Sequence, residues 1–182
     1  MGNTQEPRWL DAEEQRSWLT FAYMLIRLPA ALDAQMQRDA GISQFEYLVM
    51  AGLSMCPGHT LRMSDLADFT ASSLSRLSNV VGRLEKRGWV TRTPDPSDGR
   101  YTRAVLTEQG REKVVASAPP YVEEVRRLVF DPLNTTQQRQ LREISRRILH
   151  ANDPDDPYLD DPLGTLRSAA DSAAPPSSRE AG

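Results

Sequence analysis

The segment from residue 73 to residue 106 constrains the fold of this chain more than any other part. Residues 73–87 place their apolar side chains on one side of a helix at about 100° per residue. Gly88 predicts the end of this helix, because glycine readily takes the left-handed conformation of a C-terminal cap. Two β-prone runs, 89–93 and 101–106, then flank a stretch of Pro, Asp, Ser and Gly, which predicts a β-hairpin. The apolar side of the helix consists of Leu74, Leu77, Val80, Val81 and Leu84.

A shorter helix is predicted just before it, over residues 65–69. Ser64 is its expected N-cap, and Asp65 lies in the first turn, where a negative charge favours the helix dipole. The turn 70–72 joins the two helices into a helix-turn-helix, and the hairpin that follows makes this a winged helix-turn-helix. The predicted fold class is therefore mostly α with a small β-wing, in which a winged helix-turn-helix core is flanked by helices on both sides.

The N-terminal flank predicts two helices. The first covers residues 10–40, with Pro29 expected to kink or split it and Gly41 to end it. The second starts at Ser43, where Glu46 completes a capping box, and it runs to Cys56. The apolar stripe of the first helix consists of Trp18, Phe21, Leu25, Leu28, Leu32 and Met36.

The C-terminal flank predicts further helices. Helical spacing resumes after Thr107 and is expected to be interrupted at Pro119 and Pro120. A last helix should open with Thr135 and Gln138 as a capping box. Its predicted buried stripe consists of Leu141, Ile144, Ile148 and Leu149.

Net charge differs between parts of the chain. The whole chain carries −3, a value that by itself argues against a nucleic-acid partner. Residues 152–182 hold seven acidic and two basic residues and five of the thirteen prolines, so they carry −5 and are predicted to be a disordered tail. The other 151 residues therefore carry +2, and residues 61–106 alone carry +3. The most basic part coincides with the winged helix-turn-helix.

Other features of the sequence indicate a soluble, cytoplasmic protein. It has no apolar run of the roughly 18 residues that cross a bilayer, so no membrane partner is expected. Its N-terminus lacks the basic start and apolar stretch of an export signal. A single cysteine cannot build an internal disulfide framework.

The face of helix 73–87 opposite its apolar side carries small polar and basic residues. Such side chains allow a helix to enter the DNA major groove, where Arg pairs with guanine and Asn with adenine. A solvated surface of an ordinary amphipathic helix is the alternative. The hairpin favours DNA, because Arg100 at its tip can enter the minor groove while Asp98 braces it. Turn chemistry alone would explain Asp95, Asp98 and Gly99.

The run RMSDLADFTASSLSRLSNVVGRLEKRGWVTRTPDPSDGRYTRAVLTEQGRE resembles the core of the multiple-antibiotic-resistance regulator (MarR) family. It contains the D-x-R wing motif and the LT-x-x-G pattern that opens the next helix, and with its flanks the resemblance to actinobacterial members covers roughly residues 8–151. The resemblance implies a homodimer held by residues 8–60 and 107–151, with 61–106 binding double-stranded DNA at a pseudo-palindrome. It also implies a transcriptional regulator, commonly a repressor, whose DNA binding a small-molecule effector relieves.

The family motif assigns DNA-binding positions in this sequence, with two departures. Gly99 stands where many members have a second arginine, which removes one phosphate contact. The recognition face is richer in serine than in charge, so affinity should depend on the wing and on the two sites of a dimer. The assigned residues are Ser73, Ser75, Arg76, Ser78, Asn79 and Arg83 on the helix, and Asp98 and Arg100 on the wing.

Evidence for a metal, a redox centre or an enzyme is weak. Cys56 and His59 have a C-x-x-H spacing but lack further ligands nearby, so no metal or cofactor is expected. The family's peroxide sensors use a cysteine in the first helix, where this chain has none, and a buried, inert thiol is the expected state of Cys56. No enzyme motif is present. A protein-binding winged helix, or a metal or redox sensor on the same fold, are the alternative functions.

Five residues are candidates for an effector pocket between the flanking helices and the winged core, which is where the family's pockets lie. Core packing is the alternative role and is favoured for any single one of them. The candidates are Trp18, Tyr23, Phe45, Tyr47 and Met55.

Overall fold

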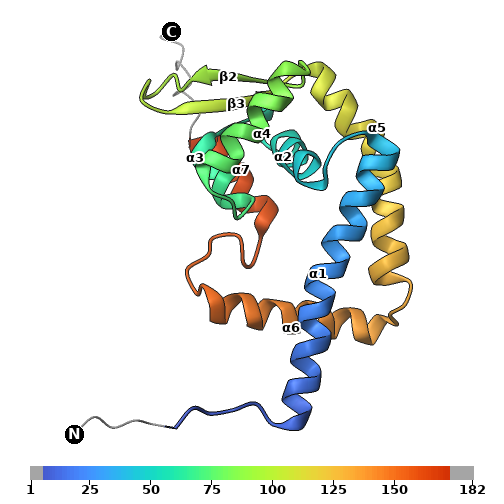
Figure 1. Ribbon diagram of the computed structural model, residues 1–182. Helices are drawn as coiled ribbons and strands as arrows, with labels where there is room; N and C mark the ends of the chain where they lie inside the picture. Colours follow the sequence, from blue (N-terminus) through green and yellow to red (C-terminus); the bar gives the residue numbers. More distant parts are fainter. Residues whose placement is uncertain (1–5, 173–182) are drawn as a thin grey trace, which may run out of the picture.

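The computed structural model describes residues 6–172 of the 182-residue chain and confirms the predicted fold class (Figure 1). A winged helix-turn-helix lies at one end of the molecule, helices α1 and α5 run side by side away from it, and α6 crosses the far end. The helices are α1 Ala12–Ala40, α2 Gln44–Met55, α3 Met63–Phe69, α4 Leu74–Lys86, α5 Glu108–Val125, α6 Thr135–Asn152 and α7 Pro162–Ser172. The strands are β1 Thr60–Arg62, β2 Val90–Pro94 and β3 Thr102–Leu106.

The sheet has three antiparallel strands in the order β1-β3-β2. The hairpin of β2 and β3 was predicted, and Val90 pairs with Leu106 at its base. Strand β1 was missed, because three residues are too few to show an alternating pattern. Its central residue, Leu61, is fully buried and lies opposite Ala104, so β1 joins the wing to the core.

The hydrophobic core belongs to the winged end and includes α2. Leu53 of α2, Leu66 of α3 and Leu77 of α4 are all fully buried in one cluster. Of the five apolar positions predicted for α4, four are buried, but Leu74 is 55% exposed because it lies at the helix start beside the wing. None of the helices in the described part of the chain combines the length and hydropathy that a bilayer span requires.

Helix starts were predicted unevenly. Ser43 and Glu46 form the expected capping box of α2. Ser64 does not cap α3, which starts at Met63, two residues before the predicted start, and its hydroxyl instead donates to Asp65. The box of α6 is formed by Asn134 and Gln137, one residue before the predicted pair, because asparagine is the stronger N-cap.

The prolines neither split α1 nor interrupt α5. Pro29 lies inside a continuous α1, and Pro119 and Pro120 lie inside α5, which extends into the π-helical turn 126–130. Each proline removes one backbone donor, and the turns on either side keep their own hydrogen bonds. Buried residues hold each helix on one side of its proline: Met36 follows Pro29 in α1, and Val114 precedes Pro119 in α5.

Residues 152–172 are not the predicted disordered tail. Helix α6 includes Asn152, and α7 packs against α2, α3 and β1 with Leu166 fully buried. Tyr158 stacks edge-on against Phe69, with 5.7 Å between ring centroids. The prediction of disorder was based on the acidic composition of the segment as a whole. Its few apolar residues are nevertheless buried, because they pack against a core that the rest of the chain forms. Residues 173–182, the remainder of the predicted tail, lie outside the described residues.

Candidate nucleic-acid interface

Helix α4 presents its polar side to solvent, as predicted. The Ser73 hydroxyl accepts from the backbone N–H of Arg76 at 3.3 Å, and Gly88 ends the helix region with a φ of +73°. Exposed Ser75 and Asn79 lie along the middle of the outward side, where small side chains let a helix approach another surface closely. The interface is therefore positioned by a capped helix whose other side is buried.

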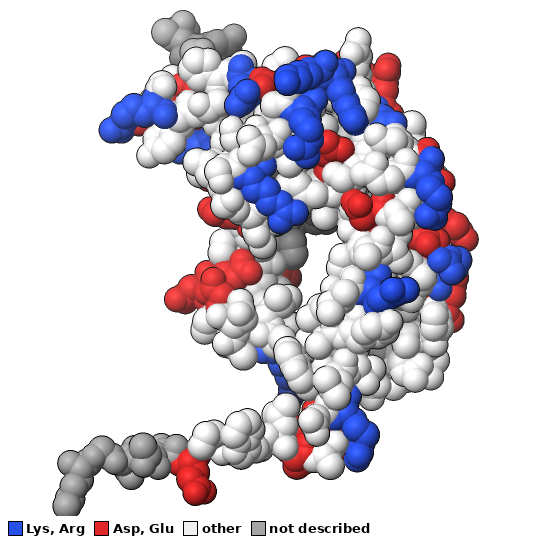
Figure 2. All heavy atoms as spheres, in the orientation of Figure 1, with Lys and Arg blue, Asp and Glu red and all other residues white. Residues whose placement is uncertain are grey.

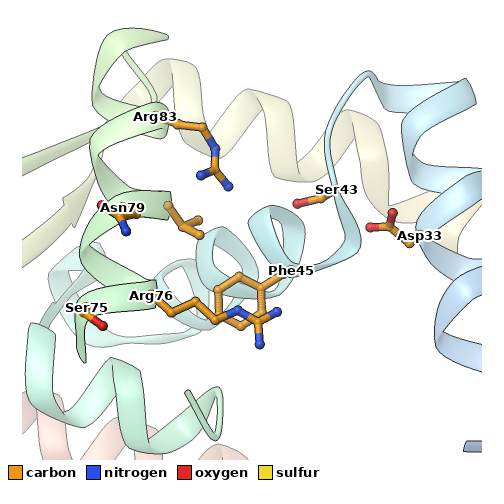
Figure 3. Close-up of a pocket in the computed structure, with 8 residues that line it drawn as sticks. Asp33, Ser43, Phe45, Ser75, Arg76, Asn79 and Arg83 are labelled. Carbon is orange, nitrogen blue, oxygen red and sulfur yellow. The ribbon is translucent and has the colours of Figure 1, made fainter. Parts of the chain in front are cut away.

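The two arginines predicted on the recognition surface turn toward α2. The Arg76 guanidinium lies 4.3 Å from the centre of the Phe45 ring, and Arg83 Nε donates to Glu46 Oε1 at 3.1 Å. Figure 3 shows both guanidinium groups pointing from α4 toward the start of α2, away from Ser75. A hollow of about 680 Å³ separates the two helices at this edge; it is lined by Asp33, Ser43, Phe45, Ser75, Arg76, Asn79, Val80 and Arg83.

The opposite edge of α4 is tied to the wing. Arg92 of β2 donates to the Ser78 hydroxyl at 3.4 Å and to Glu85 Oε2 at 2.8 Å. Ser78 is half-buried, so of the predicted recognition residues it is the least available to a ligand. A second hollow, of about 320 Å³, opens between α4 and the wing and is lined in part by Leu74 and Arg100.

Arg100 projects from the wing tip and is held by Asp98. Its side chain is 85% exposed, yet Nη2 and Nε donate to the Asp98 carboxylate at 2.6 and 3.0 Å. These hydrogen bonds raise the pKa of Arg100 and lower the pKa of Asp98. The predicted bracing contact is thus present, and it sets the direction of a guanidinium that is surrounded by solvent.

Asp95 anchors the wing, a role that was not predicted from its sequence. Its fully buried carboxylate accepts from Arg62 Nε at 2.6 Å and from Arg103 Nε at 2.9 Å, and it also caps the turn through the N–H of Ser97. Hydrogen bonds from Arg103 and then Arg62 hold the pKa of Asp95 far below its usual range. The preference of aspartate for turns therefore explains only part of the role of Asp95. No signal in the sequence showed this role, because Arg62 and Arg103 are seen to lie opposite each other, as like charges in need of a shared anion, only once β1 is paired with β3.

The five effector-pocket candidates fall into two regions. Trp18 and Tyr23 are 54% and 63% exposed on the first half of α1. Tyr47 is buried with its ring 4.7 Å from that of Tyr121, Met55 packs against the core, and Phe45 lines the hollow beside α4. The structure thus brings only Phe45 to a hollow at the interface.

Cys56 is buried at the end of α2, where its thiol donates to the Gly52 carbonyl at 3.3 Å. In the described part of the chain, no group of three or more His, Cys, Asp or Glu residues is arranged to hold a metal ion.

Comparison with known proteins supports one family. Residues 41–100 match the model of the MarR family. The transcriptional repressor MprA of Escherichia coli K12 is 30% identical over 115 residues, which are 63% of this chain and 65% of MprA, so the match spans less than two thirds of that relative.

Two solved structures are similar over most of their length. Sco3205, a MarR family transcriptional regulator from Streptomyces coelicolor in complex with DNA, is 42% identical with a TM-score of 0.80, covering 84% of this chain and 96% of Sco3205. AbsC, a MarR family transcriptional regulator from the same organism, is 34% identical with a TM-score of 0.77, covering 82% of this chain and all of AbsC. The chain therefore belongs to the MarR family of transcriptional regulators.

Proposed function

We propose that this protein is a cytoplasmic, sequence-specific DNA-binding repressor that acts as a homodimer on a pseudo-palindromic operator. The observation that carries the proposal is the capped helix α4, whose polar side faces solvent beside a wing with an exposed Arg100 braced by Asp98. Figure 2 shows basic side chains gathered over the end of the molecule that carries α4 and the wing. The DNA complex of the 42% identical Sco3205 and the repressor function of MprA support the same proposal.

The geometry gives each part of the interface a separate task. Ser75 and Asn79, in the middle of the outward side of α4, are suited to base edges in the major groove, where asparagine pairs with adenine. Arg76 and Arg83, at the edge of the helix, are suited to backbone phosphates, which position a protein on DNA without reading its sequence. Arg100 at the wing tip is suited to the minor groove, whose negative potential attracts arginine.

The wing contact is tested by Arg100→Ala. In a titration with intergenic DNA from beside its own gene, we expect the affinity to fall at least about fivefold. The slope of the logarithm of the binding constant against the logarithm of the salt concentration should become smaller in magnitude by about one. The control is Arg167→Ala, which removes an exposed arginine of α7, outside α4, the wing and the helices proposed to form the dimer. Both variants should keep the wild-type circular dichroism spectrum. Wild-type affinity in Arg100→Ala would remove the wing from the proposal.

The homodimer is supported by apolar side chains that the single chain leaves in solvent. Three of the four residues of the predicted buried stripe of α6 are instead exposed, at 55% for Ile144 and 45% for Ile148, and large exposed apolar patches mark interaction sites. A hollow of about 690 Å³ between α1 and α6 offers an apolar surface for a second copy of the chain. Other exposed apolar residues of the flanking helices are Trp18, Leu19, Leu25, Ile26, Val122, Phe130 and Leu149.

Dimer formation is tested by Ile148→Glu. Burying a carboxylate in an apolar interface is costly, so we expect a monomer in sedimentation experiments. DNA affinity should then fall about a hundredfold or more, because the two half-sites no longer bind together. His150→Glu is the control, since it places the same charge on the opposite side of the last turns of α6. A dimeric Ile148→Glu protein would contradict the proposed interface.

We also propose that a small-molecule effector acts at the hollow between α2 and α4. Phe45 is the one predicted pocket residue that lines it, together with Arg76 and Arg83. A ligand seated there would contact α4 directly and compete with its approach to DNA. Footprinting of the intergenic DNA with and without a panel of metabolites, repeated on Phe45→Ala, tests this assignment.

A further inference from the structure

The first turn of α2 holds one edge of helix α4. Phe45 and Glu46 are neighbours in sequence, and they contact Arg76 and Arg83, which lie two turns apart on α4. Arg87, one turn further along, is 4.0 Å from the Glu46 carboxylate and donates to the carbonyl of Gly41 at 3.3 Å. The junction between α1 and α2 is therefore connected to α4 through arginine side chains.

Glu46 uses each of its carboxylate oxygens for a different contact. Oε2 accepts from the backbone N–H of Ser43 at 2.9 Å and closes the capping box of α2, while Oε1 accepts from Arg83 at 3.1 Å. The side chain is only 6% exposed. Burial alone would raise the pKa of Glu46, but the hydrogen bonds from Ser43 and Arg83 and the charge of Arg87 outweigh it and lower the pKa. The buried carboxylate is therefore charged at neutral pH.

Arg83 keeps its terminal nitrogens available. Its contact with Glu46 uses Nε, and among the described residues neither Nη atom has a hydrogen-bond partner. The side chain is 54% exposed at the edge of the helix that carries Asn79, and Figure 3 shows the guanidinium extended from α4 rather than folded against it. An anion next to this edge would meet two free donors on a guanidinium whose direction is already set.

We propose that Glu46 is a positioning residue of the DNA interface, which holds Arg83 in place so that its Nη groups donate to a backbone phosphate. The inference rests on the proposed function. An arginine that is free in solution loses the freedom to rotate about several side-chain bonds when it binds DNA. Because Glu46 already restricts Arg83 in the free protein, part of this entropic cost is absent from the binding step. Arg83 then contributes affinity rather than base preference, which revises its expected role on the recognition surface.

The substitution Glu46→Gln separates positioning from simple charge. Glutamine can still close a capping box, so α2 should keep its start. In the orientation of the Glu46 side chain, the amide places an acceptor oxygen at one of the two positions and a donor NH2 at the other, so it cannot accept from both Ser43 and Arg83 there. A carboxylate near DNA repels phosphates, so loss of the charge alone would tighten binding, whereas loss of positioning weakens it. The sign of the change therefore identifies the role of Glu46.

The experiment measures affinity for the same intergenic duplex with the full-length chain. We expect Glu46→Gln to weaken binding about three- to tenfold, the ordering cost of one long side chain. Arg83→Ala should weaken binding and lower the salt slope by about one unit. The double variant should bind no more weakly than Arg83→Ala, because Glu46 then has nothing to position. Asp155→Asn, which removes an exposed carboxylate outside α4, the wing and the helices proposed to form the dimer, should bind as wild type.

A measurement without DNA tests the contact itself. In NMR spectra the Arg83 Nε–H should exchange slowly in the wild-type protein and rapidly in Glu46→Gln. Unchanged or tighter DNA binding by Glu46→Gln, or full additivity in the double variant, overturns the inference while the proposed function stands. If the wild-type protein itself fails to bind DNA, the proposed function fails and the inference fails with it.

Discussion

Asp95→Asn is expected to lower the midpoint of thermal unfolding by about 10 °C, because removing one partner of a buried ion pair is strongly destabilising. Asparagine can still cap the turn through Ser97, so the loop itself should form. Arg62 and Arg103 would lose their shared anion, and the Arg103 side chain is only 8% exposed. DNA binding should weaken as well, since the wing that carries Arg100 is attached through this cluster.

Asp98→Asn is the matched control. It removes a carboxylate three residues away in the same loop, but its partner Arg100 is 85% exposed, and surface pairs contribute little to stability. We expect its unfolding midpoint to stay within about 2 °C of wild type, because such pairs are worth so little. Equal midpoints for Asp95→Asn and Asp98→Asn would contradict the anchoring role of Asp95.

The contact of Asp95 with Arg62 and Arg103 predicts that the stability of the fold depends on pH. The pKa of Asp95 is depressed in the folded state, so its contribution to stability is present above the pKa of about 3.9 that applies to an unfolded aspartate. As the pH falls below that value, the unfolded chain takes up a proton that the folded chain does not, and the contribution decreases. The gap in unfolding midpoint between wild type and Asp95→Asn should therefore be constant from pH 7 to about 5 and narrow below about 4. A gap that stays constant through pH 3 would show that Asp95 stabilises the wing by some means other than its charge.

Features set by neighbouring residues could be predicted from the sequence. The capping box of Ser43 and Glu46 lies within four residues, and the burial of Leu77, Val81 and Leu84 follows from the helical repeat. The hairpin was evident because its strands are separated by a short turn-rich segment. The fold class and the position of the candidate interface depend on these local patterns, so both could be predicted from the sequence.

Features that depend on distant residues could not be predicted. Asp95 bonds Arg62, 33 positions away in the chain, and Tyr158 contacts Asp65 across 93 positions. The helical repeat placed Arg83 on the outward side of α4, but its direction is set by Glu46, which the fold brings to that edge from 37 positions away. The apolar stripe of α6 was visible in the sequence as a helical repeat, but such a repeat does not show which surface covers the stripe.

Helix α7 contributes a fully buried leucine to the core of the winged end. We expect Leu166→Ala to lower the free energy of unfolding by about 2 to 5 kcal/mol, the usual cost of truncating a fully buried leucine. Leu166 and Ala170 are the buried side chains through which α7 joins the core of the winged end. The Tyr158 hydroxyl adds a hydrogen bond to the carbonyl of Asp65 at 3.2 Å, and burial raises the pKa of Tyr158 to about 12.

The measurement combines thermal unfolding with limited proteolysis, both without DNA. Arg167 lies within α7 beside Leu166, so trypsin should cleave there faster in Leu166→Ala, once the helix is released from α2 and α3. Leu74→Ala is the control, because it truncates the same residue type in a helix where the side chain is 55% exposed. That variant should change stability by less than about 1 kcal/mol and leave cleavage at Arg167 unaltered. If both variants unfold at the same temperature, α7 is not part of the cooperative core. The acidic segment 153–161 that leads to α7 would then not contribute to the stability of the winged end.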